Sequence, residues 1–67
     1  MIGAHRARDR AQALQGRRIA CGISLKQVAQ RIGEQAHVLK RWERGAVTPS
    51  SESVWRNWEA AIWREVD

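Results

Sequence analysis

Apolar positions between residues 24 and 45 recur at helical spacing in two short runs that a glycine separates. The first run contains Val28, Ala29 and Ile32. Ser24 precedes this run and Gln27 follows Ser24 by three residues, which is the pattern of a capping box. We therefore expect a helix that begins at Leu25 and ends at Gly33, because glycine adopts the left-handed cap conformation at little cost.

The second run begins near Gln35 and ends at Gly45. Its apolar side carries Val38, Leu39 and Trp42, whereas Ala36, His37, Lys40, Arg41 and Arg44 cover the remaining circumference. The region 24–45 is thus predicted to form two short helices joined by a tight turn.

A longer helix is expected before this pair. The residues Ala11, Leu14, Arg18 and Cys21 share one face of a helix predicted from Arg6 to Cys21, which Gly22 ends. This spacing predicts that Cys21 is buried. Residues 1–5 show no pattern, and we expect them to be frayed.

A last helix is expected after Pro49, which restricts Thr48 to an extended conformation. Ser50 is placed to cap this helix, which would run from about residue 51 to residues 65–66. On a helical wheel Val54, Trp55, Trp58, Ala61, Ile62 and Val66 share one broad arc, and Trp63 lies about 60° outside it.

Three tryptophans in this last helix exceed what a small core holds comfortably. Tryptophan is enriched among interface anchors, and homo-oligomers are most often two-fold dimers. We therefore expect Trp55, Trp63 and Val66 to contribute to a homodimer contact. The alternative is that these side chains only close a small core.

The chain has 67 residues, which indicates one domain with too small a core to enclose a catalytic pocket. Its net charge is +5, and this charge is unevenly distributed. Residues 1–44 hold ten basic and three acidic side chains, whereas residues 45–67 hold two basic and four acidic ones. Basic charge that coincides with the helix pair favours nucleic acid as a partner, and solubility alone is the alternative explanation.

Other classes of function find little support. One cysteine allows no internal disulfide, and no apolar run approaches the roughly 18 residues of a membrane span, so we expect a cytoplasmic protein. The candidates for nucleophilic or proton-transfer chemistry are His5, His37 and Cys21, and no cluster has metal-ligand spacing. We expect no enzyme, no cofactor, no metal and no small-molecule substrate.

The pattern also resembles a known family. The ordered residues Ile23, Ser24, Val28, Ala29, Gly33, Leu39, Trp42, Glu43, Gly45 and Pro49 resemble the helix-turn-helix domain of the Cro and phage-repressor family, also called the xenobiotic-response-element family. The sequence Trp-Glu-Arg-Gly followed by Thr-Pro-Ser is similar to the family signature after the recognition helix. The resemblance covers roughly residues 17–62 and implies a compact, all-α, lambda-repressor-like fold of four to five helices.

The resemblance also implies which residues meet DNA. In such domains the second helix of the motif lies in the major groove and the first crosses the backbone. Carried over residue by residue, base contacts fall to Gln35, Ala36, His37, Lys40 and Arg41. Backbone contacts are expected from Lys26, Gln27, Arg44 and Thr48. Chemically, glutamine pairs with adenine, lysine or arginine with guanine, and an alanine methyl with the methyl of thymine.

Two further expectations concern arginines. Family members pair the arginine at the place of Arg18 with the glutamate of the Trp-Glu motif, which implies an ion pair between Arg18 and Glu43. The second expectation concerns a basic arm formed by Arg6, Arg8 and Arg10, which could reach phosphates or a minor groove; a solvated helix face is the alternative.

One departure from the family pattern lies just after the turn glycine. Family members usually carry an apolar residue and then serine or threonine, where this chain has Glu34 and Gln35. The recognition helix is therefore expected to lack its usual core anchor and its usual cap.

These observations predict a small dimeric repressor or autorepressor that binds double-stranded DNA at a palindromic operator. Cro-like, antitoxin-like and anti-CRISPR-associated regulators of phages or mobile elements all fit this description. The alternative is a protein-interaction module that docks through the Trp-rich last helix and binds DNA weakly or not at all.

Overall fold

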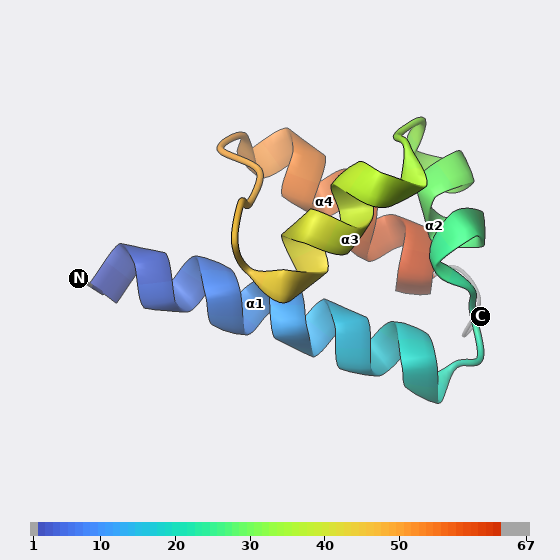
Figure 1. The fold of residues 1–67 in the computed structure, drawn as a ribbon, viewed down its shortest axis with the longest axis horizontal. Helices are drawn as coiled ribbons and strands as arrows, with labels where there is room; N and C mark the ends of the chain where they lie inside the picture. The colour runs from blue at the N-terminus through green and yellow to red at the C-terminus, as the bar shows by residue number, and fades with distance from the viewer. Residues whose placement is uncertain (1, 64–67) are drawn as a thin grey trace.

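The computed structural model describes the backbone of residues 2–63 and the side chains of residues 6–63 (Figure 1). The described residues form four helices and no strand: α1 (Ile2–Ala20), α2 (Leu25–Ile32), α3 (Ala36–Arg44) and α4 (Glu52–Trp63). Figure 1 shows α1 along the long axis, with α3 in front of α4 and α2 at the end where α1 terminates. The predicted all-α fold of four to five helices is confirmed.

The helix pair forms where local signals placed it. The Ser24 hydroxyl accepts a hydrogen bond from the Gln27 amide at 3.0 Å, and Gln27 Oε1 accepts one from the Ser24 amide at 2.9 Å. Gly33 ends α2 with φ 71°, in the left-handed region that favours glycine. The predicted start, cap and end of α2 are therefore all confirmed.

The first helix differs from its prediction at both ends. It begins at Ile2 rather than Arg6, and it ends at Ala20, so Cys21 lies in the turn that follows. The prediction that Cys21 is buried is wrong, because the side chain is exposed in this turn. The last helix begins at Glu52, one residue later than expected, and its predicted end at 65–66 lies outside the described residues.

Three tryptophans form the centre of the core. Trp58 is fully buried, with its ring centroid 5.5 Å from that of Trp42 and 5.2 Å from that of Trp55. Around them lie Ala11, Leu14, Ile23, Val28, Ala29, Leu39, Ala61 and Ile62. Aromatic pairs at these distances add to the stability gained from burying their area.

The predicted interface role of Trp55 is corrected by this packing. Trp55 is only 5% exposed, and its Nε1 donates a hydrogen bond to the Pro49 carbonyl at 2.9 Å. Its face is covered by Trp58 and its polar edge is satisfied within the chain, so nothing of it is left for a partner. Trp63 remains 46% exposed, and Val66 lies outside the described residues.

Candidate nucleic-acid interface

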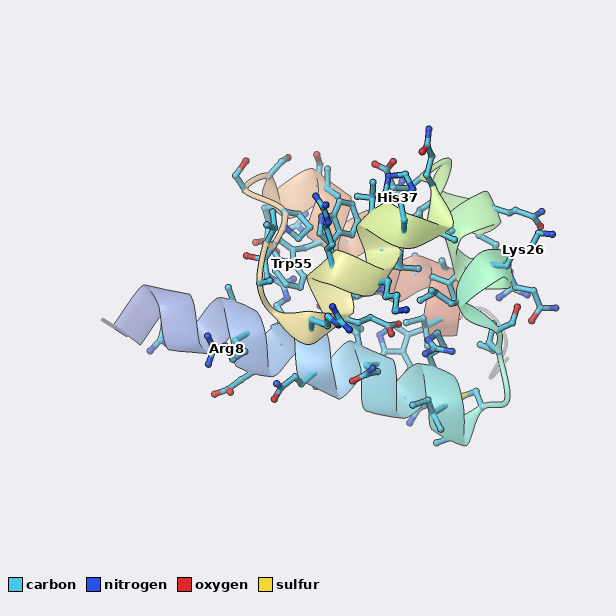
Figure 2. The ribbon with its side chains drawn as sticks, viewed as in Figure 1. Arg8, Lys26, His37 and Trp55 are labelled. Carbon is cyan, nitrogen blue, oxygen red and sulfur yellow. The ribbon has the colours of Figure 1, made fainter. Side chains whose placement is uncertain are left out.

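Helix α3 divides cleanly into a buried and an exposed side. Leu39, Trp42 and Glu43 are buried against the other helices. The side chains at the N-cap and on the outer face are all exposed: Gln35, Ala36, His37, Lys40, Arg41 and Arg44. Figure 2 shows His37 on the side of α3 turned away from α1. The five residues predicted to contact bases therefore share one exposed surface, which carries basic and amide groups.

The start of α3 is capped in an unusual way. Gln35 occupies the N-cap position but makes no side-chain capping hydrogen bond. Instead Glu34 Oε1 accepts a hydrogen bond from the Gln35 amide at 3.0 Å. This carboxylate lies near the positive end of the helix dipole, where it is favoured. The side-chain amide of Gln35 is exposed and makes no capping hydrogen bond.

A buried ion pair anchors α3 to α1. Arg18 Nε lies 2.7 Å from Glu43 Oε2, and its second terminal nitrogen donates to Glu43 Oε1 at 3.1 Å. The remaining terminal nitrogen donates to the Ile23 carbonyl at 2.9 Å. Only 14% of the Arg18 side chain and 3% of the Glu43 side chain are exposed. The predicted pair is thus present, in the two-point geometry that fixes the orientation of both groups.

The residues predicted to contact the DNA backbone are less uniform. Lys26 and Gln27 are exposed in the first turn of α2, although Gln27 already uses its Oε1 in the capping box. Arg44 is exposed in the last turn of α3, and Thr48 is half-buried in the loop between α3 and α4. Lys26 lies on α2, at the end of the molecule opposite to the N-terminus (Figure 2).

The predicted basic arm is corrected at Arg10. Its Nε donates to Glu59 Oε2 at 2.9 Å, and its terminal nitrogens donate to Glu52 at 2.9 and 3.2 Å. The guanidinium carbon also lies 4.6 Å from the centroid of the Trp55 ring. Hydrogen bonds to Glu52 and, to a smaller extent, Glu59 raise the pKa of Arg10. The hydrogen bonds that Arg10 donates to Glu52 hold the pKa of that carboxyl group below its usual range. Arg10 therefore joins α1 to α4 and is not part of a DNA-binding arm.

Other arginines of the basic half also make internal contacts that the sequence did not reveal. The Arg17 guanidinium carbon lies 4.0 Å from the centroid of the Trp63 ring. Arg31 donates to the Ala61 carbonyl at 2.9 Å, near the end of α4. The seven-residue spacing of Glu52 and Glu59, which places both on one helix face, was the signal that could have revealed a partner for Arg10.

No other kind of site is evident in the described part of the chain. Residues 6–63 contain no group of three or more metal-ligating side chains, and no described helix is long and apolar enough to cross a membrane. A hollow of about 220 Å³ is lined by Arg6, Ala7, Arg10 and Trp55. It is smaller than the roughly 300–1,000 Å³ typical of ligand pockets.

Comparison with known proteins identifies a family for this chain. No curated protein and no solved structure shows significant similarity to the chain. The sequence model of the helix-turn-helix family, however, matches residues 14–56, which include all of α2, the turn and α3. Since the match covers well over half of the chain, this protein belongs to the Cro/C1-type helix-turn-helix family of DNA-binding regulators.

Proposed function

We propose that this protein is a small dimeric repressor that occupies a palindromic operator. The exposed outer face of α3, with its basic and amide side chains, is the observation that carries the proposal. When a domain of this kind binds, α3 enters the major groove and α2 crosses the backbone. Occupation of a promoter in this way blocks transcription without a further activity.

The outer face of α3 supplies a consistent set of base contacts. Gln35 can accept and donate at one adenine, Lys40 and Arg41 suit guanine, and the methyl of Ala36 suits thymine. His37 adds a ring nitrogen that can donate or accept. The phosphates on either side fall to Lys26, Gln27, Arg44 and Thr48, which fix the register without reading sequence.

The proposed dimer contact no longer includes Trp55, which is buried, and rests on Trp63. Trp63 is the exposed tryptophan of α4, at 46% exposure, and the Arg17 guanidinium stacks on its ring. A two-fold contact through Trp63, with Val66 as a predicted neighbour, would present two α3 helices to half-sites about one duplex turn apart. Sedimentation that finds a monomer at micromolar concentration, with operator binding intact, would refute the dimer.

The DNA-binding proposal is tested by fluorescence anisotropy. The protein is titrated against a duplex from its own upstream promoter and against a scrambled duplex, over a series of salt concentrations. A preference for the promoter of about a thousandfold or more is expected of a specific autoregulator. Lys40→Ala combined with Arg41→Ala should weaken promoter binding roughly 30-fold or more, because each base contact contributes about 1–3 kcal/mol.

Arg56→Ala is the matched control, since it removes an exposed arginine from α4 and leaves α3 unchanged. Promoter affinity that survives the double substitution and equals that of the control would refute the role of α3.

The context that we propose is a phage or mobile element. The regulator would then be Cro-like, antitoxin-like or anti-CRISPR-associated.

A second function, a protein-interaction module, is favoured by the exposed Trp63 and by the carboxylate of Glu34 at the start of α3. The two proposals separate in one experiment. If the chain acts through a protein partner, the Lys40 and Arg41 substitutions leave partner capture unchanged and Trp63→Ser abolishes it.

A further inference from the structure

The first turns of α1 lie outside the part of the chain that matches the family. The match begins at residue 14, whereas α1 begins at Ile2. This segment is nevertheless part of the folded unit, because Ala11 is fully buried and Arg10 binds two glutamates of α4. The turn of helix around residues 7–11 is thus held in a fixed position.

Arg8 and Arg10 point in different directions from this turn. Residues two positions apart on a helix are separated by about 200° around its axis, so Arg8 and Arg10 cannot face the same neighbour. Arg10 faces α4. The stem of Arg8 instead lies against the end of α3, where a Cβ placed on Gly45 would come within 2.7 Å of Arg8 Cγ. The side chain of Arg8 therefore packs over Gly45, the residue that directly follows Arg44.

Arg8 has a different electrostatic role from Arg10. It is exposed, and no carboxylate lies within ion-pair distance of it among the described residues. The glutamates of the neighbouring helices are already paired, since Glu43 binds Arg18 while Glu52 and Glu59 bind Arg10. Asp9 is exposed and follows Arg8 directly, about 100° further around the helix.

Basic charge consequently gathers where α1 meets the end of α3. Arg41 and Arg44 occupy the last turn of α3, and the methylene stem of a third arginine, Arg8, lies beside Gly45. Part of this charge is balanced by the negative end of the α3 dipole. All three side chains are exposed, so a polyanion can approach them from solvent.

Arg8 also lies on the side of α3 opposite to Lys26. Figure 2 shows Arg8 and Lys26 toward opposite ends of the molecule, with His37 of α3 between them. A helix in the major groove has a phosphate backbone along each edge of the groove. With Lys26 at one end, a cation at the other end is placed to meet the opposite backbone.

We infer that Arg8 contacts a DNA phosphate and extends the DNA-binding surface beyond the family core. The inference rests on the proposed function, because it takes α3 to lie in the major groove. The contact is to the sugar-phosphate backbone, so it strengthens binding to every sequence and does not select among them. Its chemistry is that of a charge-assisted hydrogen bond from a guanidinium to a phosphate oxygen.

The test compares Arg8→Gln with the parent in the anisotropy assay. Glutamine keeps the Cβ and Cγ methylenes that lie closest to Gly45 and replaces the charged end of the side chain with a shorter, neutral amide. Since each neutralised phosphate contributes about 0.9 to the slope of log affinity against log salt, the slope should become shallower by about 0.9 for each bound protomer, which is about 1.8 for the proposed dimer. The loss of affinity should be the same factor for promoter and scrambled duplexes.

Two further variants serve as controls. Arg8→Lys retains the charge and should restore most of the slope, whereas Arg56→Gln removes one charge from α4 and should leave the slope unchanged. Thermal melts of all variants detect a purely structural role. If Arg8→Gln lowers the melting temperature and leaves the slope intact, Arg8 only stabilises the end of α3 and the inference is wrong.

The two proposals fail separately. If the parent shows no preference for its promoter, the proposed autoregulator is refuted, and the slope on the scrambled duplex still reports whether Arg8 meets a phosphate. If the parent prefers its promoter and the slope of Arg8→Gln equals that of the parent, only the inference about Arg8 is refuted.

Discussion

The buried pair between Arg18 and Glu43 should be the most sensitive single contact outside the tryptophan core. Replacing Arg18 by alanine removes both hydrogen bonds to Glu43 and the bond to the Ile23 carbonyl. Glu43, at 3% exposure, would then be a buried carboxylate without its partner. Breaking such a pair from one side destabilises a protein by about 3–5 kcal/mol.

That loss is large for a chain of this length. At about 0.05–0.15 kcal/mol per residue, 67 residues correspond to a stability of roughly 3–10 kcal/mol. For a small domain, 1 kcal/mol shifts the melting temperature by about 4–8 °C, so Arg18→Ala should melt at least about 12 °C below the parent. If the stability of the parent lies near the lower end of this range, part of the Arg18→Ala population should already be unfolded at 25 °C.

Circular dichroism at 222 nm during heating and urea titration measures this effect. The double replacement of Arg18 by methionine and Glu43 by leucine shows whether the uncompensated charge is responsible. It should recover much of the lost stability, because apolar groups of similar volume remove the buried charge together with its partner. An Arg18→Ala protein that melts with the parent would refute the reasoning, and so would a double variant as unstable as Arg18→Ala.

Two other predictions concern glycine geometry and pH. Gly45→Ala should lower the melting temperature more than Gly33→Ala, because φ is positive at both sites but only at Gly45 would the new Cβ lie 2.7 Å from Arg8 Cγ; equal losses would contradict the close contact. Hydrogen bonds from Arg10 hold the pKa of Glu52 low in the folded protein. This pair therefore stabilises the folded state at pH values above the ordinary glutamate pKa of about 4.3, and the stabilisation is lost as the pH falls through the lower pKa of the folded state. Between pH 5 and pH 3 the melting temperature of the parent should therefore fall more than that of Glu52→Gln, and parallel curves would contradict the pairing.

Local features of the fold were predictable because their causes lie within a few residues. The capping box of Ser24 and Gln27 and the left-handed Gly33 and Gly45 are fixed by short-range hydrogen bonds and sterics. The pair between Arg18 and Glu43 spans 25 positions, and it was expected only through the family resemblance.

Two of the errors, those at Arg10 and Trp55, concern long-range packing. The partners of Arg10 lie 42 and 49 positions away, so its neutralisation depends on how α1 packs on α4. Trp55 was assigned to an interface by counting tryptophans. Stacking on Trp58 takes place within α4, but Trp55 is also covered from outside this helix, by Arg10 of α1 and by the loop that contains Pro49. Cys21 was misassigned because its face was extrapolated one residue past the end of α1.

The internal arginine contacts also explain how a basic chain concentrates its charge on one surface. Four arginines of the first 44 residues make contacts within the fold, namely Arg10, Arg17, Arg18 and Arg31. Three of the glutamates, Glu43, Glu52 and Glu59, are paired by two of these arginines. Within the described part of the chain no hydrogen bond, ion pair or ring contact involves Arg8, Lys26, Lys40, Arg41 or Arg44, which are exposed on or beside the helix pair. The ion pairs that stabilise the fold also keep these carboxylates from repelling phosphate. Substituting Glu59 or Glu52 should therefore leave DNA affinity nearly unchanged. Substituting Arg10 should weaken binding only as far as it unfolds the domain.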